Sequence, residues 1–323
     1  MLSKNAVAHY LKPLSPIPTN INPSGTIDGV LRCILFDIYG TLFISETGEI
    51  STLKLNSDKL NTINQLLAKY HIRKDPNRIL EEVFEAISNK HKILQNSGIN
   101  VPEIQIDRIW MDITGRSDES VRDFATEFEL IINPVSPMPH LKKLITACRA
   151  SGLLMGIISN AQFYTEYLFH WFLGSSPEGL GFHKDMLFYS YISGHAKPSQ
   201  YMFKSASAIL NKMGIAEDSV LYVGNDMRND IWTGNEIGFK TALFAGDARS
   251  LKLRKDDSTY KDIYPDIIVT DLNQLIGFLK IKKYRMSNPA YRKEPITQME
   301  KWEGELRDSV FDILNSTFAV QIF

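Results

Sequence analysis

Three polar residues, Asp37, Tyr39 and Thr41, follow a short run of apolar residues near the N-terminus. An aspartate at the end of a buried strand can act as a nucleophile, forming an ester or an acyl phosphate that water later cleaves. Gly40 allows a sharp turn, and Thr41 can hydrogen-bond back to hold the loop. Taken alone, these residues also permit Asp37 to do no more than cap a turn.

Two further groups of residues could bind an anion. Ser159 and Asn160 follow a buried run, where a hydroxyl and backbone N–H groups before a helix can hold an anion or can simply cap the helix. Lys197 precedes Pro198, which we predict to be the first residue of a helix. A lysine there can neutralise a phosphate or hold a carboxylate nucleophile, although a surface lysine is the plainer interpretation.

The fourth group is the segment 224–230, which contains two aspartates and two asparagines within six residues. Magnesium prefers hard oxygen ligands and keeps several waters, so Asp226 and Asp230 together with a phosphate could hold it. The alternative is a solvated loop in which Asn229 or Asp230 caps the next helix.

These groups need a scaffold, and the pattern of the chain predicts one. Short apolar runs of strand length alternate with helical spacing, which indicates an α/β fold with a parallel, doubly wound sheet. The predicted strands cover residues 32–37, 153–158, 219–223, 241–244 and 266–270, and helices are predicted around 141–148 and 202–213. We expect all four groups at the carboxyl ends of core strands, where open α/β sheets bind ligands.

Residues 44–134 interrupt this alternation with successive helical patterns and no strand signal, so we predict an inserted helical module that can cover the crevice. Its last helix should begin near Ser117 or Asp118. The remaining boundaries follow: an irregular N-terminal arm with four prolines (1–29), a core (30–43 and 135–279) and a C-terminal extension (280–323).

The bulk composition excludes several classes of protein. The chain has 323 residues, 44% of them hydrophobic and 23% charged, and a net charge of −1, which favours neither nucleic acid nor an anionic membrane. The two cysteines suggest no disulfide framework. With no secretory signal and no membrane-spanning run, we expect a cytoplasmic protein.

In their order along the chain, the four groups resemble the motifs of the haloacid dehalogenase (HAD)-like hydrolase superfamily, over roughly residues 30–275. The resemblance implies a Rossmann-like core with a helical cap of the C1 type, here residues 44–134. It implies that Asp37 is the nucleophile and that Ser159, Lys197, Thr41 and Asn160 bind the transferred group. Magnesium would be held by Asp37, the backbone carbonyl of Tyr39, Asp226 and Asp230.

Tyr39 departs from the pattern of the phosphatases in this superfamily, which usually carry a second aspartate there as general acid and base. Losing such a group typically costs roughly 10²–10⁴-fold in rate. Superfamily members that cleave carbon–halogen bonds do carry FDxYGT, release a halide that needs no proton, and need no magnesium. They also carry an arginine soon after the first motif, whereas here the first arginine after that motif is Arg73.

Three hypotheses follow. The first is a Mg²⁺-dependent hydrolase of a small phosphorylated molecule, in which Asp37, Tyr39 and Lys197 form the catalytic group. The second is a 2-haloacid dehalogenase. The third is a non-catalytic protein that binds a phosphorylated ligand. In each case we expect no nucleic-acid or membrane partner, and self-association through residues 280–323 is a further hypothesis.

Overall fold

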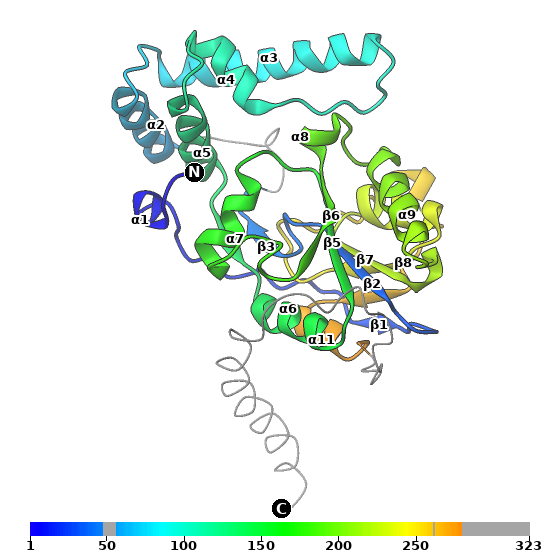
Figure 1. Ribbon diagram of the computed structural model, residues 1–323. Helices are drawn as coiled ribbons and strands as arrows, with labels where there is room; N and C mark the ends of the chain where they lie inside the picture. The colour runs from blue at the N-terminus through cyan, green and yellow to red at the C-terminus, as the bar shows by residue number, and fades with distance from the viewer. Residues whose placement is uncertain (48–55, 261, 280–323) are drawn as a thin grey trace, which may run out of the picture. The chain divides into compact units, whose positions relative to one another are not determined.

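A seven-stranded sheet forms the centre of the computed structural model, which describes residues 1–47, 56–260 and 262–279 (Figure 1). Its strands pair in parallel, except that β1 is antiparallel to its neighbour β9. In sheet order the strands are β1 (Ser24–Gly25), β9 (Ile267–Val269), β8 (Lys240–Phe244), β7 (Val220–Gly224), β2 (Cys33–Phe36), β5 (Leu154–Ser159) and β6 (Phe182–Tyr189).

Helices cover both faces of this sheet, because successive side chains of a strand point to opposite faces. Ile34 and Phe36 of β2 join the hydrophobic cluster that contains α6 (Leu141–Ala150) and α11 (Leu272–Ile276), which lie side by side in Figure 1. Cys33 and Leu35 join the cluster of α9 (Tyr201–Lys212). The α/β, doubly wound fold is therefore confirmed. Shorter elements complete the core: α7 (Thr165–Leu173), α8 (Ser190–Ser193), α10 (Thr233–Ile237), η2 (Glu217–Ser219), η3 (Met227–Trp232) and η4 (Ser258–Tyr260).

The five predicted strands and the two predicted core helices are present with small shifts at their ends. Strand β6 was not expected, because His183, Lys184 and Asp185 interrupt its apolar pattern. The prediction that Pro198 begins a helix was wrong. The Lys197–Pro198 peptide bond is cis, and α9 begins only at Tyr201.

Four helices lie between β3 (Phe43–Ser45) and β4 (Val135–Pro137), two short strands that pair antiparallel. We call residues 57–132 the helical insertion. Its helices are α2 (Ser57–Lys69), α3 (Pro76–Asn96), α4 (Ile106–Thr114) and α5 (Ser120–Ile132). The last helix begins slightly later than predicted, and Glu119, not Ser117 or Asp118, occupies its N-cap position. Asp118 still accepts a hydrogen bond from the backbone N–H of Ser120.

The helical insertion has its own hydrophobic core, separate from those of the sheet. Trp110 is 1% exposed, and its ring lies 4.9 Å from that of Phe124 and 4.7 Å from that of Phe128, with edge-to-face geometry. Aromatic pairs of this kind stabilise a core by about 0.5–1.5 kcal/mol beyond the burial of their area. The insertion is thus packed well enough to present a fixed wall.

The N-terminal residues are largely irregular but are fixed to the core. After α1 (Lys4–Val7), the backbone N–H of Leu14 donates to Ser136 Oγ and that of Ile17 donates to Asp247 Oδ1.

The predicted domain boundaries stay predictions. The predicted extension at 280–323, with its proposed role in self-association, lies outside the described residues. Within the described part of the chain, no helix has the length and apolar character needed to cross a bilayer.

Candidate active site

The polar groups predicted from the sequence meet at one edge of the sheet, where β7, β2 and β5 are adjacent. Asp37 directly follows β2, Ser159 is the last residue of β5, and the segment 225–230 follows β7. Lys197 reaches the same place by another route than expected. It lies in the loop between α8 and α9, well after the end of β6.

Lys197 connects two buried aspartates at the centre of the site. Its Nζ donates to Asp37 Oδ1 at 2.7 Å and to Asp230 Oδ1 at 2.6 Å. The exposed fractions of Asp37, Lys197 and Asp230 are only 6%, 5% and 1%. Buried charges need partners of opposite sign, and this arrangement supplies them.

The electrostatics of this group follow from its burial. Burial lowers the pKa of Lys197, but the charges of Asp230 and Asp37 outweigh that effect and raise it overall. Burial raises the pKa of Asp230 to about 6, against the opposing effect of Lys197. Lys197 therefore stays protonated at neutral pH and places a positive charge beside the Asp37 carboxylate.

Asp230 is held on all sides and organises the site. Its Oδ2 accepts the backbone N–H groups of Asn225 and Asp226, each at 2.9 Å. Its Oδ1 lies 3.0 Å from Tyr222 Oη, which also accepts a bond from Lys197 at 3.0 Å. Sequence reasoning missed Tyr222. The signal was a phenol inside an otherwise aliphatic buried strand, where its hydroxyl must find a partner.

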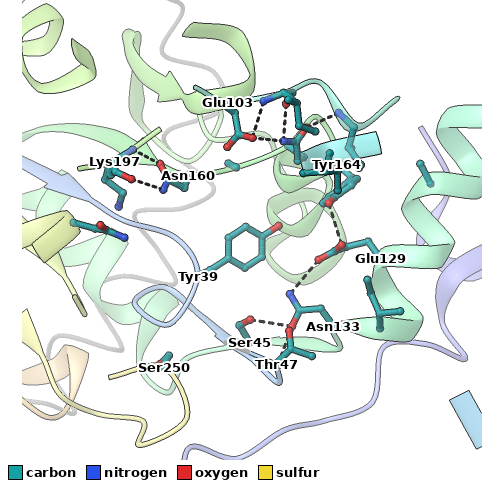
Figure 2. Close-up of a pocket in the computed structure, with 18 of the residues that line it drawn as sticks. Tyr39, Ser45, Thr47, Glu103, Glu129, Asn133, Asn160, Tyr164, Lys197 and Ser250 are labelled. Atoms are coloured by element: carbon teal, nitrogen blue, oxygen red, sulfur yellow. Dashed lines mark hydrogen bonds between the residues drawn. The ribbon is translucent and has the colours of Figure 1, made fainter. Parts of the chain in front are cut away.

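The two residues after β5 have different tasks. Ser159 Oγ donates to Asp37 Oδ1 at 2.8 Å, so it touches the predicted nucleophile directly. Asn160 holds the backbone of Lys197 instead: its Oδ1 accepts from Lys197 N at 2.7 Å, and its Nδ2 donates to Lys197 O at 3.2 Å (Figure 2). Asn160 is therefore placed to position Lys197.

Thr41 and Gly40 fix the loop that follows Asp37. Thr41 Oγ1 donates to Asn225 Oδ1 at 3.1 Å, which ties this loop to the one after β7. Gly40 has a φ of +79°, and a Cβ there would lie 2.5 Å from Ser250 Cβ, so both the conformation and the space require glycine. The predicted contact of Thr41 with a transferred group stays a prediction.

Asp226, a predicted metal ligand, is paired with Arg254. Arg254 Nε lies 3.1 Å from Asp226 Oδ1, and Arg254 Nη2 lies 2.5 Å from Asp226 Oδ2. Asp226 Oδ1 also accepts the backbone N–H groups of Arg228 and Asn229. Arg254 could not be singled out from the sequence, because it is distant from Asp226 along the chain.

The predicted magnesium ligands do not form a ready metal site. Both carboxylate oxygens of Asp226 face a guanidinium, and both of Asp230 face N–H or O–H donors. In the described ranges, no cluster of three or more His, Cys, Asp or Glu side chains is arranged to hold a metal. In this arrangement the two carboxylates do not fit the ion, because Lys197 and Arg254 already neutralise them.

Tyr39 lies beside a cavity of about 580 Å³ that joins the edge of the sheet to the helical insertion (Figure 2). Its Oη is 3.0 Å from Thr165 Oγ1. Burial, followed by the nearby charge of Glu129, raises the pKa of Tyr39 far above its ordinary value. The phenol therefore keeps its proton at neutral pH and cannot act as a general base.

At the far side of Tyr39, a carboxyl from the helical insertion faces the same cavity. Glu129 Oε2 accepts from Tyr164 Oη at 3.0 Å, and Glu129 Oε1 accepts from Asn133 Nδ2 at 3.1 Å (Figure 2). Burial raises the pKa of Glu129. Sequence reasoning did not single out Glu129, because a glutamate within a helix is ordinary in sequence and becomes informative only when the cavity is known.

Comparison with known proteins identifies the family. Residues 31–238 match the family described as hydrolase: haloacid dehalogenase-like hydrolase, and the chain belongs to that family. The match covers the edge of the sheet described above. The chain is therefore a HAD-like hydrolase, as the order of its motifs indicated.

One relative is the glyceraldehyde 3-phosphate phosphatase of Methanocaldococcus jannaschii, 26% identical over 198 residues that cover 61% of this chain and 80% of that protein. Similar solved structures include a HAD phosphatase from Thermococcus onnurineus (TM-score 0.49, 16% identity, 79% of this chain and 100% of that one). Another is a 2-haloacid dehalogenase from Pseudomonas syringae pv. Tomato DC3000 (TM-score 0.48, 16% identity, 77% and 98%).

Proposed function

We propose that this hydrolase cleaves a phosphate ester through a covalent intermediate on Asp37. The observation that carries the proposal is the position of the Asp37 carboxylate, whose Oδ1 accepts from Lys197 at 2.7 Å and from Ser159 at 2.8 Å. Both donors leave Oδ2 for attack, and the cationic Lys197 lies where the charge of a phosphoryl group must be offset. The phosphatase relative supports the same chemistry.

The proposed reaction has two steps. Asp37 Oδ2 attacks phosphorus, the bond from phosphorus to the ester oxygen breaks, and that oxygen leaves with the electron pair. Water then cleaves the aspartyl phosphate, which restores the Asp37 carboxylate and releases inorganic phosphate. Lys197 and Ser159 hold the nucleophile and offset negative charge in both steps, while Asn160 keeps Lys197 in place.

Mg²⁺ dependence stays a prediction from the resemblance, and no step of this proposal uses the ion. The Asp226–Arg254 pair and the saturated Asp230 do not fit a magnesium site in their present arrangement. Arg254 would have to release Asp226 before that carboxylate could bind a cation.

We also propose that the helical insertion is the cap of this site, as its residues line the same cavity as Asp37. The cytoplasmic location stays a prediction.

A carbon–halogen hydrolase is the second candidate, and Tyr39 favours it. A halide leaves without a proton, and the paired state of Asp226 also suits a reaction that needs no metal. Against this candidate, none of the described residues that line the cavity is an arginine that could receive the halide. We therefore rank it below ester hydrolysis.

A direct assay separates the two candidates. The full-length protein is incubated with p-nitrophenyl phosphate and acetyl phosphate, with MgCl₂ and with EDTA, and with 2-chloropropionate. We expect phosphate release that Asp37→Asn abolishes, and no chloride release. Chloride release that depends on Asp37, without phosphate release, would establish the second candidate instead.

A further inference from the structure

The cavity above the nucleophile is large and mainly apolar. Its volume of about 580 Å³ lies within the roughly 300–1,000 Å³ of sites that enclose drug-sized ligands. Most of its apolar lining comes from the helical insertion and includes Leu80, Val83, Ile87, Trp110 and Phe128. Such a surface gains little from the hydroxyl groups of a sugar or a triose, and it gains much from a ring that excludes water.

Two carboxyl groups of the insertion, Glu103 and Glu129, line the cavity, together with His91 of α3, whose Nε2 is buried with no hydrogen-bond partner in the described part of the chain. Glu129 accepts from Tyr164 and Asn133, and Glu103 accepts from Ser190 Oγ at 2.7 Å and from Gln162 Nε2 at 3.2 Å. No arginine occurs among the described residues lining the cavity, and its described lysines, Lys197 and Lys252, belong to the core segments. Both Glu129 oxygens accept hydrogen bonds from the protein, so we expect a ligand group that meets Glu129 to be a hydrogen-bond donor.

Tyr39 limits the leaving group independently of the cavity. Its phenol is hydrogen-bonded to Thr165 at 3.0 Å and is buried, so no carboxyl group stands in the usual place to protonate a departing oxygen. An alkoxide leaves poorly without a proton, whereas a phenolate, whose conjugate acid has a pKa of about 10 or less, leaves more readily. The site therefore favours an ester of an acidic alcohol.

From these observations we propose that the substrate is an aryl phosphate monoester. The phosphoryl group lies at Asp37 and Lys197, the aromatic ring fills the apolar cavity, and a donor substituent on the ring meets Glu129. In the first step the Asp37–phosphorus bond forms and the bond from phosphorus to the aryl oxygen breaks, so that a phenolate departs with the electron pair and later takes a proton from water. This inference rests on the proposed phosphate-ester hydrolysis.

The test compares kcat/KM of the full chain across three matched esters. These are 4-(hydroxymethyl)phenyl phosphate, 4-methylphenyl phosphate and glyceraldehyde 3-phosphate. We expect both aryl esters to exceed the triose phosphate by about 10²-fold or more, and the hydroxymethyl ester to exceed the methyl ester by about tenfold. A triose phosphate that reacts as well as the aryl esters would overturn the inference.

Two variants localise the effect. Ile87→Asn, in the cavity wall, should lower kcat/KM for the aryl esters by roughly tenfold or more and leave the triose phosphate unaffected. Ile93→Asn is the matched control, because Ile93 lies on the same helix and is 61% exposed. Glu129→Gln should remove the preference for the hydroxymethyl ester, and Glu119→Gln on the exposed start of α5 should not.

These outcomes separate the two proposals. If no ester yields Asp37-dependent phosphate, the proposed function itself fails. If p-nitrophenyl phosphate is hydrolysed in an Asp37-dependent way but the aryl preference is absent, or Ile87→Asn and Ile93→Asn behave alike, only the aryl inference fails. Thermal unfolding of each variant tests whether it is folded at the assay temperature.

Discussion

The edge of the sheet and the helical insertion contribute opposite kinds of surface to one cavity. At the edge, Asp37, Lys197 and Asp230 are joined by hydrogen bonds that fix nearly every polar atom. The insertion offers apolar side chains and few polar groups, among them Glu129. The difference supports our proposal that the edge of the sheet carries the chemistry and that the helical insertion selects the substrate.

Removing the nucleophile should have the largest effect. Asp37→Asn keeps the shape and one acceptor oxygen but loses the anionic nucleophile, so we expect kcat for p-nitrophenyl phosphate to fall by roughly 10⁴-fold or more. Phosphate release measures the loss. As a control, Asp218→Asn at an exposed position should retain full activity. An active Asp37→Asn protein would remove the edge of the sheet from the chemistry.

Restoring an acid at residue 39 should change the leaving groups that the site accepts. Tyr39→Asp supplies a proton donor, so we expect kcat/KM for alkyl phosphates such as glycerol phosphate to rise by about 10²–10⁴-fold. For p-nitrophenyl phosphate the gain should be much smaller, because its leaving group needs no proton. Tyr39→Phe is the control and should leave the dependence on leaving-group pKa as steep as in the parent. Equal gains on both substrates would contradict this role for residue 39.

Removing Lys197 should also destabilise the fold. Lys197→Met leaves Asp37 and Asp230 buried without a cation, so we expect the free energy of unfolding at pH 7 to drop by about 3–5 kcal/mol. Urea unfolding followed by circular dichroism gives the value. Lys204→Met, at an exposed position on α9, should lie within about 0.5 kcal/mol of the parent. Similar values for the two variants would mean that the network is not stabilising.

The pH dependence of stability tests the burial of Asp230. Because its pKa is raised to about 6 in the folded protein, the folded state binds more protons than the unfolded state between about pH 4 and 6. Its contribution is therefore fully present below pH 4 and declines as pH rises through 6. We expect Asp230→Asn to lack this decline in urea unfolding across the same range. A parallel pH profile in both proteins would show that Asp230 titrates normally.

A smaller effect should follow from freeing Asp226. Arg254→Met removes the guanidinium from Asp226, so we expect 5 mM MgCl₂ with phosphate to raise the melting temperature of this variant by a few degrees more than that of the parent. Arg249→Met is the control, because Arg249 also pairs with an aspartate, through Nε to Asp247 Oδ1. A strong response of the parent to magnesium, equal to that of the variant, would show that Arg254 does not exclude the metal.

Most of the scaffold could be predicted from local signals in the sequence. The apolar runs before Asp37 and around 153–158 and 219–223 predicted adjacent core strands, and strands that end at one edge bring their following residues together. Strand β6 was not predicted, because charged residues interrupt its apolar pattern. Lys197, in the loop between α8 and α9 that follows this strand, therefore could not be placed from the pattern.

Several contacts on which the proposals rest could not be predicted from the sequence. The Asp226–Arg254 pair depends on how two loops pack, and Glu129 gains meaning only from the cavity that it faces. Tyr222 is intermediate, because a phenol within a buried strand predicts a hydrogen bond but not its partner. These contacts depend on long-range packing, which the sequence pattern does not show.

The central claim, a covalent intermediate on Asp37, is tested most directly by rapid acid quench of the full chain with an aryl phosphate labelled with ³²P. We predict label on the peptide that contains Asp37, released by hydroxylamine as expected for an acyl phosphate, and no label in Asp37→Asn. Turnover without any labelled protein at the earliest quench times, with Asp37→Asn still active, would contradict the account.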